Sequence, residues 1–270
     1  MTTLWPIALI TFKEGIRNRA IYGIFLMALM LLIVNSLLCS MIPQEVGKVA
    51  VDIALSTVYF SGLLLVFFVG INLMAKDLDR RTIYMVISRP ISRSQYIFGK
   101  FFGVVLLIIT AMVILGIFAV LSIFLIKLSY PGYYQRFSWP IVLMALAFSV
   151  LPLILLSAMS FLFASFTSSS FITLVLTMIA YIIGRSSYDV KALIESAVAS
   201  SISPSPVTVM LVKIAYYLFP NLSVFDLKTQ AAHGLSVDGS YIVWAVLYAL
   251  VYTSLVLAIA ALIFRRREFP

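Results

Sequence analysis

Six long runs of apolar residues, separated by turns or by polar and charged segments, form the main pattern of the sequence. A helix needs about 20 apolar residues to cross the hydrocarbon core of a bilayer, and five of the runs reach that length. The fifth run along the chain is short, and the pattern does not define its end. The predicted spans are residues 21–42, 53–75, 101–126, 140–163, 171–184 and 241–264. We therefore expect an all-α integral membrane protein with six transmembrane helices.

The fourth and fifth spans are inferred from one uncharged stretch of 48 residues, 137–184, which is too long for a single span. This stretch has to fold back at residues 166–170, where serine and threonine favour a turn. Pro152 lies inside the fourth span and is expected to kink it, because proline lacks a backbone N–H and clashes with the preceding turn.

The first 19 residues show the periodicity of an amphipathic helix. One face carries the apolar residues and the other the charges, which predicts a helix lying flat at the membrane interface. The alternative is a frayed tail. The apolar face comprises Leu4, Ile7, Ala8, Thr11, Phe12 and Ile16, and the polar face Lys13, Glu14 and Arg17.

Residues 185–240 form the longest segment between two spans and carry charges scattered among apolar residues. The element Ile202-Ser203-Pro204-Ser205-Pro206 separates two short predicted helices, at about 189–200 and 207–219. We expect a structured loop here rather than a flexible linker.

Residues 76–100 are the densely charged part of the chain, with six Lys or Arg and two Asp between two uncharged runs. Within this segment, residues 77–88 predict a short amphipathic helix that ends at Arg89-Pro90, because a residue before proline disfavours the helical region. A new helix is expected to start at Ser92-Arg93-Ser94-Gln95. Two interpretations stay open at this point: a docking helix for a cytoplasmic partner, or an ordinary basic loop whose arginines reach the lipid headgroups.

The distribution of basic residues predicts the orientation in the membrane. Loops with more Lys and Arg usually face the cytoplasm, and long loops count little in this rule. With both termini inside, twelve Lys or Arg lie on the cytoplasmic side and seven outside, four of the seven in the long 185–240 loop. Both termini and the 76–100 segment are therefore expected to be cytoplasmic.

The composition and motif content of the chain disfavour several classes of partner and site. The chain is 63% hydrophobic and 11% charged, and its net charge of +9 lies mainly at span ends, which disfavours a nucleic-acid partner. One cysteine, Cys39, excludes an intramolecular disulfide, and one histidine, His233, excludes a multi-histidine metal centre. The sequence contains no GxxxxGK[ST] phosphate loop, so we do not expect this chain to hydrolyse nucleotide alone.

The segment from Asp77 to Lys100 resembles the first cytoplasmic loop of ABC-2-type transporter permeases, especially the branch of multi-copper enzyme maturation permeases. The similarity lies in its acidic-Arg-Thr opening, its Ser-Arg-Pro centre and its Gly-Lys close. Residues 1–19 are similar to the elbow helix of that family, and residues 217–228 resemble an element before its last span. The abundance of Met and Phe is better explained by packing and lipid contact than by a metal path.

This resemblance implies a single ABC-2-type transmembrane domain over residues 1–270, in which residues 77–88 are a coupling helix that docks into an ABC ATP-binding subunit. It implies a homodimer in a bacterial or archaeal cytoplasmic membrane, with ATP and Mg²⁺ in the partner subunit, no cofactor or metal in this chain, and an external or periplasmic partner for the 185–240 loop. The residues to which the coupling role is assigned are Asp77, Asp79, Arg80, Arg81, Thr82, Arg89 and Arg93.

The expected function is that of a permease subunit that moves a hydrophobic or amphipathic substrate outward when its partner hydrolyses ATP. The alternative is a mechanotransmission or assembly subunit that acts on an external partner without transport. An ion-coupled carrier or an intramembrane enzyme is disfavoured, because the six predicted spans contain no ionisable residue.

Overall fold

A computed structural model describes residues 4–41, 45–74, 92–133, 137–199 and 205–266, and these ranges contain helices and no strand. Six helices within them are long and apolar enough to cross a membrane, as predicted. The helices are α1 (Leu4–Ile16), α2 (Arg19–Met41), α3 (Val46–Leu65), α6 (Arg93–Ser129), α7 (Trp139–Phe148), α8 (Val150–Phe166), α9 (Ser170–Ala199), α10 (Pro206–Leu218), α11 (Lys228–His233) and α12 (Gly239–Arg266). Short 3-10 helices occupy Pro131–Tyr133 (η2) and Leu222–Phe225 (η3), and a π-helical turn, η1 (Val66–Gly70), extends α3 so that the span reaches Met74.

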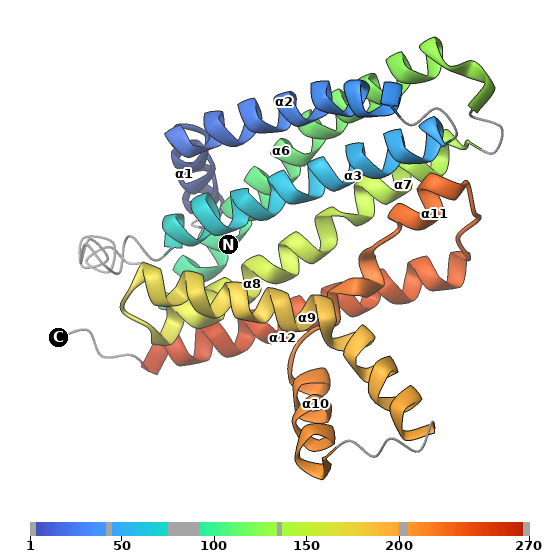
Figure 1. Cartoon of the computed structure of the whole chain (residues 1–270). Coiled ribbons are helices and arrows are strands. Elements are labelled where there is room, and N and C mark those ends of the chain that lie inside the picture. Colours follow the sequence, from blue (N-terminus) through green and yellow to red (C-terminus); the bar gives the residue numbers. More distant parts are fainter. Residues whose placement is uncertain (1–3, 42–44, 75–91, 134–136, 200–204, 267–270) are drawn as a thin grey trace.

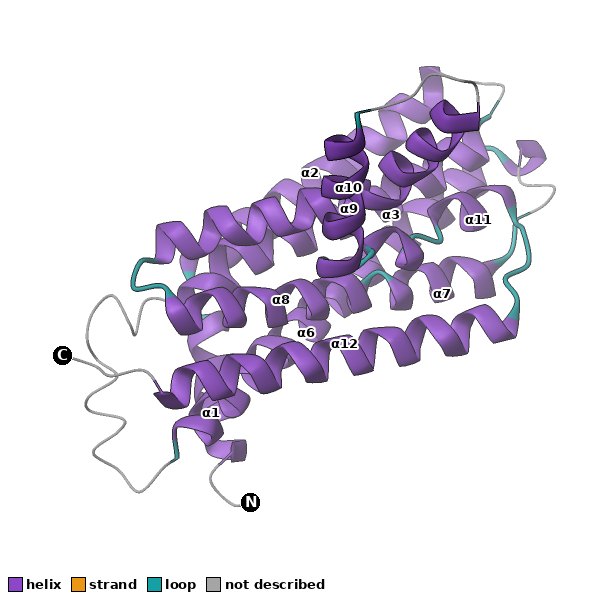
Figure 2. Ribbon diagram, turned by 90° about the horizontal axis from the view of Figure 1, so that it is seen from below, coloured by secondary structure: helices purple, strands orange, loops and turns teal. Residues whose placement is uncertain are grey.

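The spans lie side by side as a bundle, and α1 lies across one end of it (Figure 1). Helix α6 is central, because it contacts α1, α2, α3, α8 and α12. The second half of α9 turns away from the bundle and lies beside α10, so that the two project from it (Figures 1 and 2). The N-terminus of α6, the C-terminus of α12 and the turn between α8 and α9 lie at the same end as α1 (Figure 2).

Helix α1 packs against α6 at a contact made by glycines. A Cβ on Gly103 would lie 2.6 Å from the Ala8 carbonyl oxygen, and one on Gly99 would lie 2.8 Å from Ile7. The Gly99-x-x-x-Gly103 pair therefore serves the approach of the N-terminal helix. The amphipathic helix predicted for residues 1–19 is confirmed as α1. Its predicted apolar face is wrong at one residue, because Ile16 is 40% exposed and its neighbour Gly15 is buried instead.

The fourth span is interrupted close to the position at which the kink is predicted. The helix breaks at Ser149, between α7 and α8, three residues before Pro152. Proline has no N–H to bond to the carbonyl of Phe148, so the regular helix cannot pass through this turn. The Ser149 hydroxyl instead donates to the carbonyl of Leu146 at 2.6 Å. The turn predicted at 166–170 is confirmed, because α8 ends at Phe166 and α9 begins at Ser170.

Two helices extend beyond the predicted spans. The helix of the third span starts at Arg93, which confirms the helix start predicted at Ser92-Arg93-Ser94-Gln95 and lies several residues before the predicted span at Phe101. The fifth span, whose end the sequence does not define, belongs to a helix that passes Gly184, since α9 continues to Ala199 and includes the short helix expected at 189–200. The expected helix at 207–219 corresponds to α10. The coupling helix expected at 77–88 lies outside the described residues.

Candidate functional site

Between α10 and α12 the chain returns into the bundle as a short re-entrant segment. We use this name for residues 222–233, which comprise η3 and α11 and follow α10 after a bend of 51°. Helix α11 packs against α3 and α7, and η3 packs against α9 and α8. Gly234 directly follows the segment and caps α11 with a φ of 63°, a left-handed conformation that glycine adopts without steric cost. Its buried apolar residues are Leu222, Phe225, Leu227 and Ala231.

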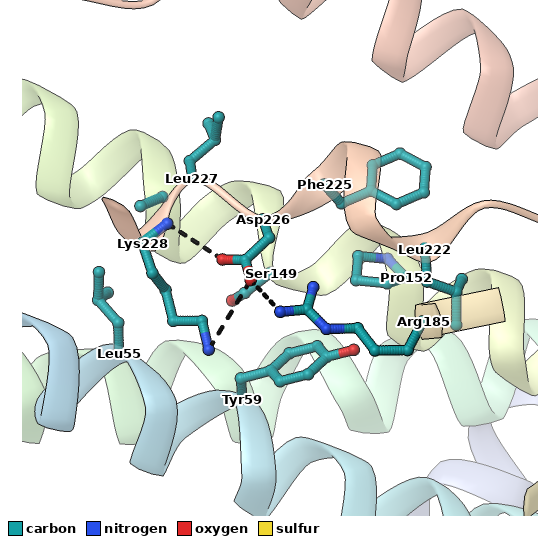
Figure 3. A pocket seen from close by; sticks show the side chains of 11 residues that line it. Leu55, Tyr59, Ser149, Pro152, Arg185, Leu222, Phe225, Asp226, Leu227 and Lys228 are labelled. Carbon is teal, nitrogen blue, oxygen red and sulfur yellow. Dashed lines mark hydrogen bonds and ion pairs between the residues drawn. The ribbon is translucent and has the colours of Figure 1, made fainter. Parts of the chain in front are cut away.

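Three charged side chains meet where the re-entrant segment contacts α9 and α3, and we call them the charged cluster: Arg185, Asp226 and Lys228 (Figure 3). The Asp226 carboxylate lies between the two cations. It accepts a hydrogen bond from the Arg185 guanidinium, and its Oδ2 lies 3.9 Å from Lys228 Nζ. The other carboxylate oxygen, Oδ1, accepts from the backbone N–H of Lys228 at 3.1 Å.

The charged cluster is also held by α3. Lys228 Nζ donates to the hydroxyl of Ser56 at 3.3 Å and lies 5.8 Å from the centre of the Tyr59 ring. Lys228 thus bonds to a residue 172 positions earlier in the chain. The charged cluster therefore joins α3, α9 and the re-entrant segment.

Further hydrogen bonds attach the start of the re-entrant segment to α9 and α12. The Ser223 hydroxyl donates to the carbonyl of Arg185 at 2.7 Å, and the backbone N–H of Asn221 donates to the Tyr248 hydroxyl at 2.9 Å. Gly184 allows this approach, since a Cβ there would lie 2.6 Å from the Pro220 carbonyl oxygen. The segment is thus bonded to two spans independently of its charges.

The charged cluster lies beside two of the candidate spans. Arg185 lies within the span Ser170–Val190, and Ser56 and Tyr59, which Lys228 contacts, lie within the span Val46–Met74. Ionised groups within a bilayer are costly unless they are paired, and each member of the cluster has a partner of opposite charge.

The side chains around the charged cluster leave little space. The cavity between them is about 20 Å³, room for about one water molecule, and its lining includes Tyr59, Ser149 and Pro152. It does not accommodate an organic substrate. The described residues also contain no group of three or more His, Cys, Asp or Glu that could hold a metal ion. The arrangement is therefore suited to holding the re-entrant segment in place.

A second set of contacts ties together the two helix ends that flank residues 75–91. Lys100 is only 5% exposed, its Nζ donates to the carbonyl of Leu73, and it lies 5.6 Å from the centre of the Tyr96 ring. Arg93 donates to the Arg265 carbonyl at 3.3 Å and so connects α6 to the end of α12. The Ser92 hydroxyl and the Gln95 side chain form a capping box that starts α6. We call the Lys100–Leu73 and Arg93–Arg265 bonds the clamp.

Of the residues predicted to couple to an ATPase, the structure places Arg93, which belongs to the clamp. The others lie outside the described residues: Asp77, Asp79, Arg80, Arg81, Thr82 and Arg89. The charged cluster was missed by sequence reasoning, although Arg185 directly follows the predicted fifth span. Likewise, Lys100 directly precedes the predicted third span. Helices α6 and α9 therefore include the charged residues Lys100 and Arg185, which lie just outside the predicted spans. The signal for Asp226 and Lys228 was two opposite charges in an otherwise apolar stretch before the last span.

Six helices that are long and apolar enough to cross a membrane define a multi-pass helical membrane protein. The chain matches the family described as protein of unknown function, DUF2705, over residues 24–269. It therefore belongs to that family. A search of curated proteins found no match to this chain.

Proposed function

We propose that this chain is the transmembrane subunit of a type-2 ABC transporter, working as a homodimer with ATP-binding subunits in the cytoplasmic membrane of a bacterium or archaeon. ATP and Mg²⁺ belong to the partner subunit, and this chain has no hydrolytic role. The proposal rests on the likeness of residues 77–100 to the coupling loop of such permeases, together with the six-span fold. Both termini and the 75–91 segment face the cytoplasm in this proposal.

The observation that carries the proposal is the clamp. A coupling element can pass on force only if both spans attached to it move with it. The chain enters residues 75–91 from the end of the second span and leaves them into α6, and Lys100 bonds these two helices at that point. Because a buried, hydrogen-bonded ammonium is expensive to separate from its acceptor, the two helix ends are held together as one unit.

The same helices reach the charged cluster. The second span carries Leu73 at the clamp and both Ser56 and Tyr59 at the cluster. A displacement at the clamp would therefore reach the re-entrant segment through one continuous helix. In the proposed cycle, nucleotide binding moves the clamp, and the re-entrant segment responds on the outer side.

A second candidate function, mechanotransmission to an external partner, is favoured by the region after Gly184. This region is built of α9, α10 and the re-entrant segment rather than an open loop, and the cavity at the charged cluster is only about 20 Å³. A fluorescent phosphatidylglycerol in proteoliposomes separates the two functions. ATP-driven outward movement of this probe supports export, and hydrolysis without movement supports mechanotransmission.

Co-purification tests the shared part of both functions. The tagged full chain is extracted from its native membrane in mild detergent, and the amount of ABC ATP-binding subunit that accompanies it is measured. We expect the R80E/R81E variant to lose this subunit, because the reversed charges oppose docking. The matched control is K48E/K213E, which reverses two exposed lysines on α3 and α10 and should keep the subunit. Equal recovery with R80E/R81E and the unchanged chain contradicts the docking assignment, provided that both elute as monodisperse proteins.

A further inference from the structure

A hollow of about 750 Å³ lies between α1 and the end of the second span. Its lining comes from the last two turns of α1, the turn into α2 and the residues just before Met74. The lining residues include Ile10, Lys13, Arg17, Asn18, Asn72 and Leu73. This hollow shares no residue with the charged cluster, and Leu73 is the residue that it shares with the clamp.

The polar part of the hollow is rich in hydrogen-bond donors. Lys13 and Arg17 are exposed and lie four residues apart on α1, so they share one face. Asn18 uses its Oδ1 to accept from the N–H of Ala20 at 3.0 Å, and its Nδ2 makes no hydrogen bond within the described residues. The carboxylate of Glu14 also lines the hollow, so its charged groups sum to one positive charge. Such a set of donors fits an anionic group.

An exposed apolar side chain lies among these donors. Ile10, which lines the hollow, is 65% exposed. An amphipathic helix buries such side chains at the boundary between lipid headgroups and acyl chains. Lys13 and Arg17 lie on the same face of α1 as Ile10, so an occupant of the hollow meets two cations and an apolar side chain.

We propose that this hollow binds the phosphate of an anionic phospholipid, with its acyl chains on the apolar side chains of α1. Basic pockets between spans commonly bind lipid headgroups in this way. The exposed Ile10 side chain favours a lipid over free phosphate, because free phosphate leaves Ile10 uncovered. The bound lipid fixes α1 to the membrane beside the second span.

Lipid retention in the purified full chain tests the proposal. The protein is incubated in detergent with equal amounts of phosphatidylglycerol and phosphatidylcholine of the same chain length, and bound lipid is counted by native mass spectrometry. We expect selective binding of phosphatidylglycerol, weakened about tenfold in K13Q/R17Q. The charge-conserving variant K13R/R17K should bind as the unchanged chain does. The matched control K48Q/K213Q removes two exposed lysines elsewhere and should have no effect.

Three results would overturn the proposal. They are equal binding of the two lipids, unchanged binding in K13Q/R17Q, and displacement of phosphatidylglycerol by excess inorganic phosphate, which would assign the hollow to the free ion. The thermal midpoints of the variants are compared first. A K13Q/R17Q variant that unfolds early is replaced by the single variants K13Q and R17Q, whose losses should each be smaller and in the same direction.

Discussion

Two cations, the buried Lys100 and the partly exposed Arg185, show how single residues fit charges into this apolar protein. Lys100 and Arg185 each lie directly beside a predicted span, and each is accommodated by a specific acceptor: the Leu73 carbonyl for Lys100 and the Asp226 carboxylate for Arg185. The runs of apolar residues alone suggest that neither charged residue belongs to the helix beside it. Because the acceptors come from elsewhere in the chain, each helix includes its charged residue.

Replacing Lys100 by methionine keeps most of the side-chain volume and removes the donor to Leu73. We expect K100M to lose about 1–3 kcal/mol of stability, because a buried carbonyl loses its partner. The thermal midpoint in detergent measures this loss. The control K213M changes an exposed lysine on α10 and should leave the midpoint unchanged, and equal midpoints for K100M and K213M would contradict the role of the clamp.

Replacing Asp226 by asparagine removes the anion from between two cations. Breaking a buried ion pair costs about 3–5 kcal/mol, and since the three side chains are 22–38% exposed we expect about 2 kcal/mol here. The re-entrant segment should then detach more often. Hydrogen exchange should accelerate in peptides covering residues 222–233 while α2 stays protected.

The control for this variant is D52N, which changes an exposed carboxylate on α3 and should leave exchange in residues 222–233 unaltered. If D226N exchanges there no faster than D52N, the charged cluster does not hold the segment.

At the scale of helices, the sequence predicts what is local and misses what depends on neighbours. Charge-free runs locate all six spans, since the bilayer thickness sets their length, and Pro152 marks the interruption of the fourth span at Ser149. The continuation of α9 beyond Gly184 could not be predicted, because it depends on Arg185 meeting Asp226 across 41 positions. The charged cluster as a whole was unpredictable for the same reason.

The packing of α1 on α6 gives a prediction at this scale. We expect G103V to displace α1, since even a Cβ at this position would lie 2.6 Å from backbone and side-chain atoms of α1. Overpacking of this kind costs about 1–3 kcal/mol. Faster hydrogen exchange in residues 4–16 would report the displacement.

Gly23 offers the matched control for that experiment, because a Cβ there meets nothing within 4 Å. G23V should leave exchange in α1 unchanged. Similar exchange in G103V and G23V would show that the glycine contact does not hold the helix.

At the scale of the whole molecule, the proposed orientation places α1 and the turn between α8 and α9 in the cytoplasm. It places Lys48 and Lys213 toward the outside. In a C39A background, a membrane-impermeant thiol reagent applied to intact cells should label K48C and K213C and spare S168C. Labelling of S168C in intact cells, with K48C spared, would reverse the orientation and remove residues 75–91 from any cytoplasmic partner.

The central claim is that residues 77–88 couple this membrane protein to an ATPase, and the rate of ATP hydrolysis tests it most directly. The purified ATP-binding subunit is assayed in lipid nanodiscs with the unchanged chain, with R80E/R81E and with the control K48E/K213E. We predict that the unchanged chain and the control raise the rate severalfold over the isolated subunit and that R80E/R81E does not. A rate with R80E/R81E equal to that with the unchanged chain would contradict the account.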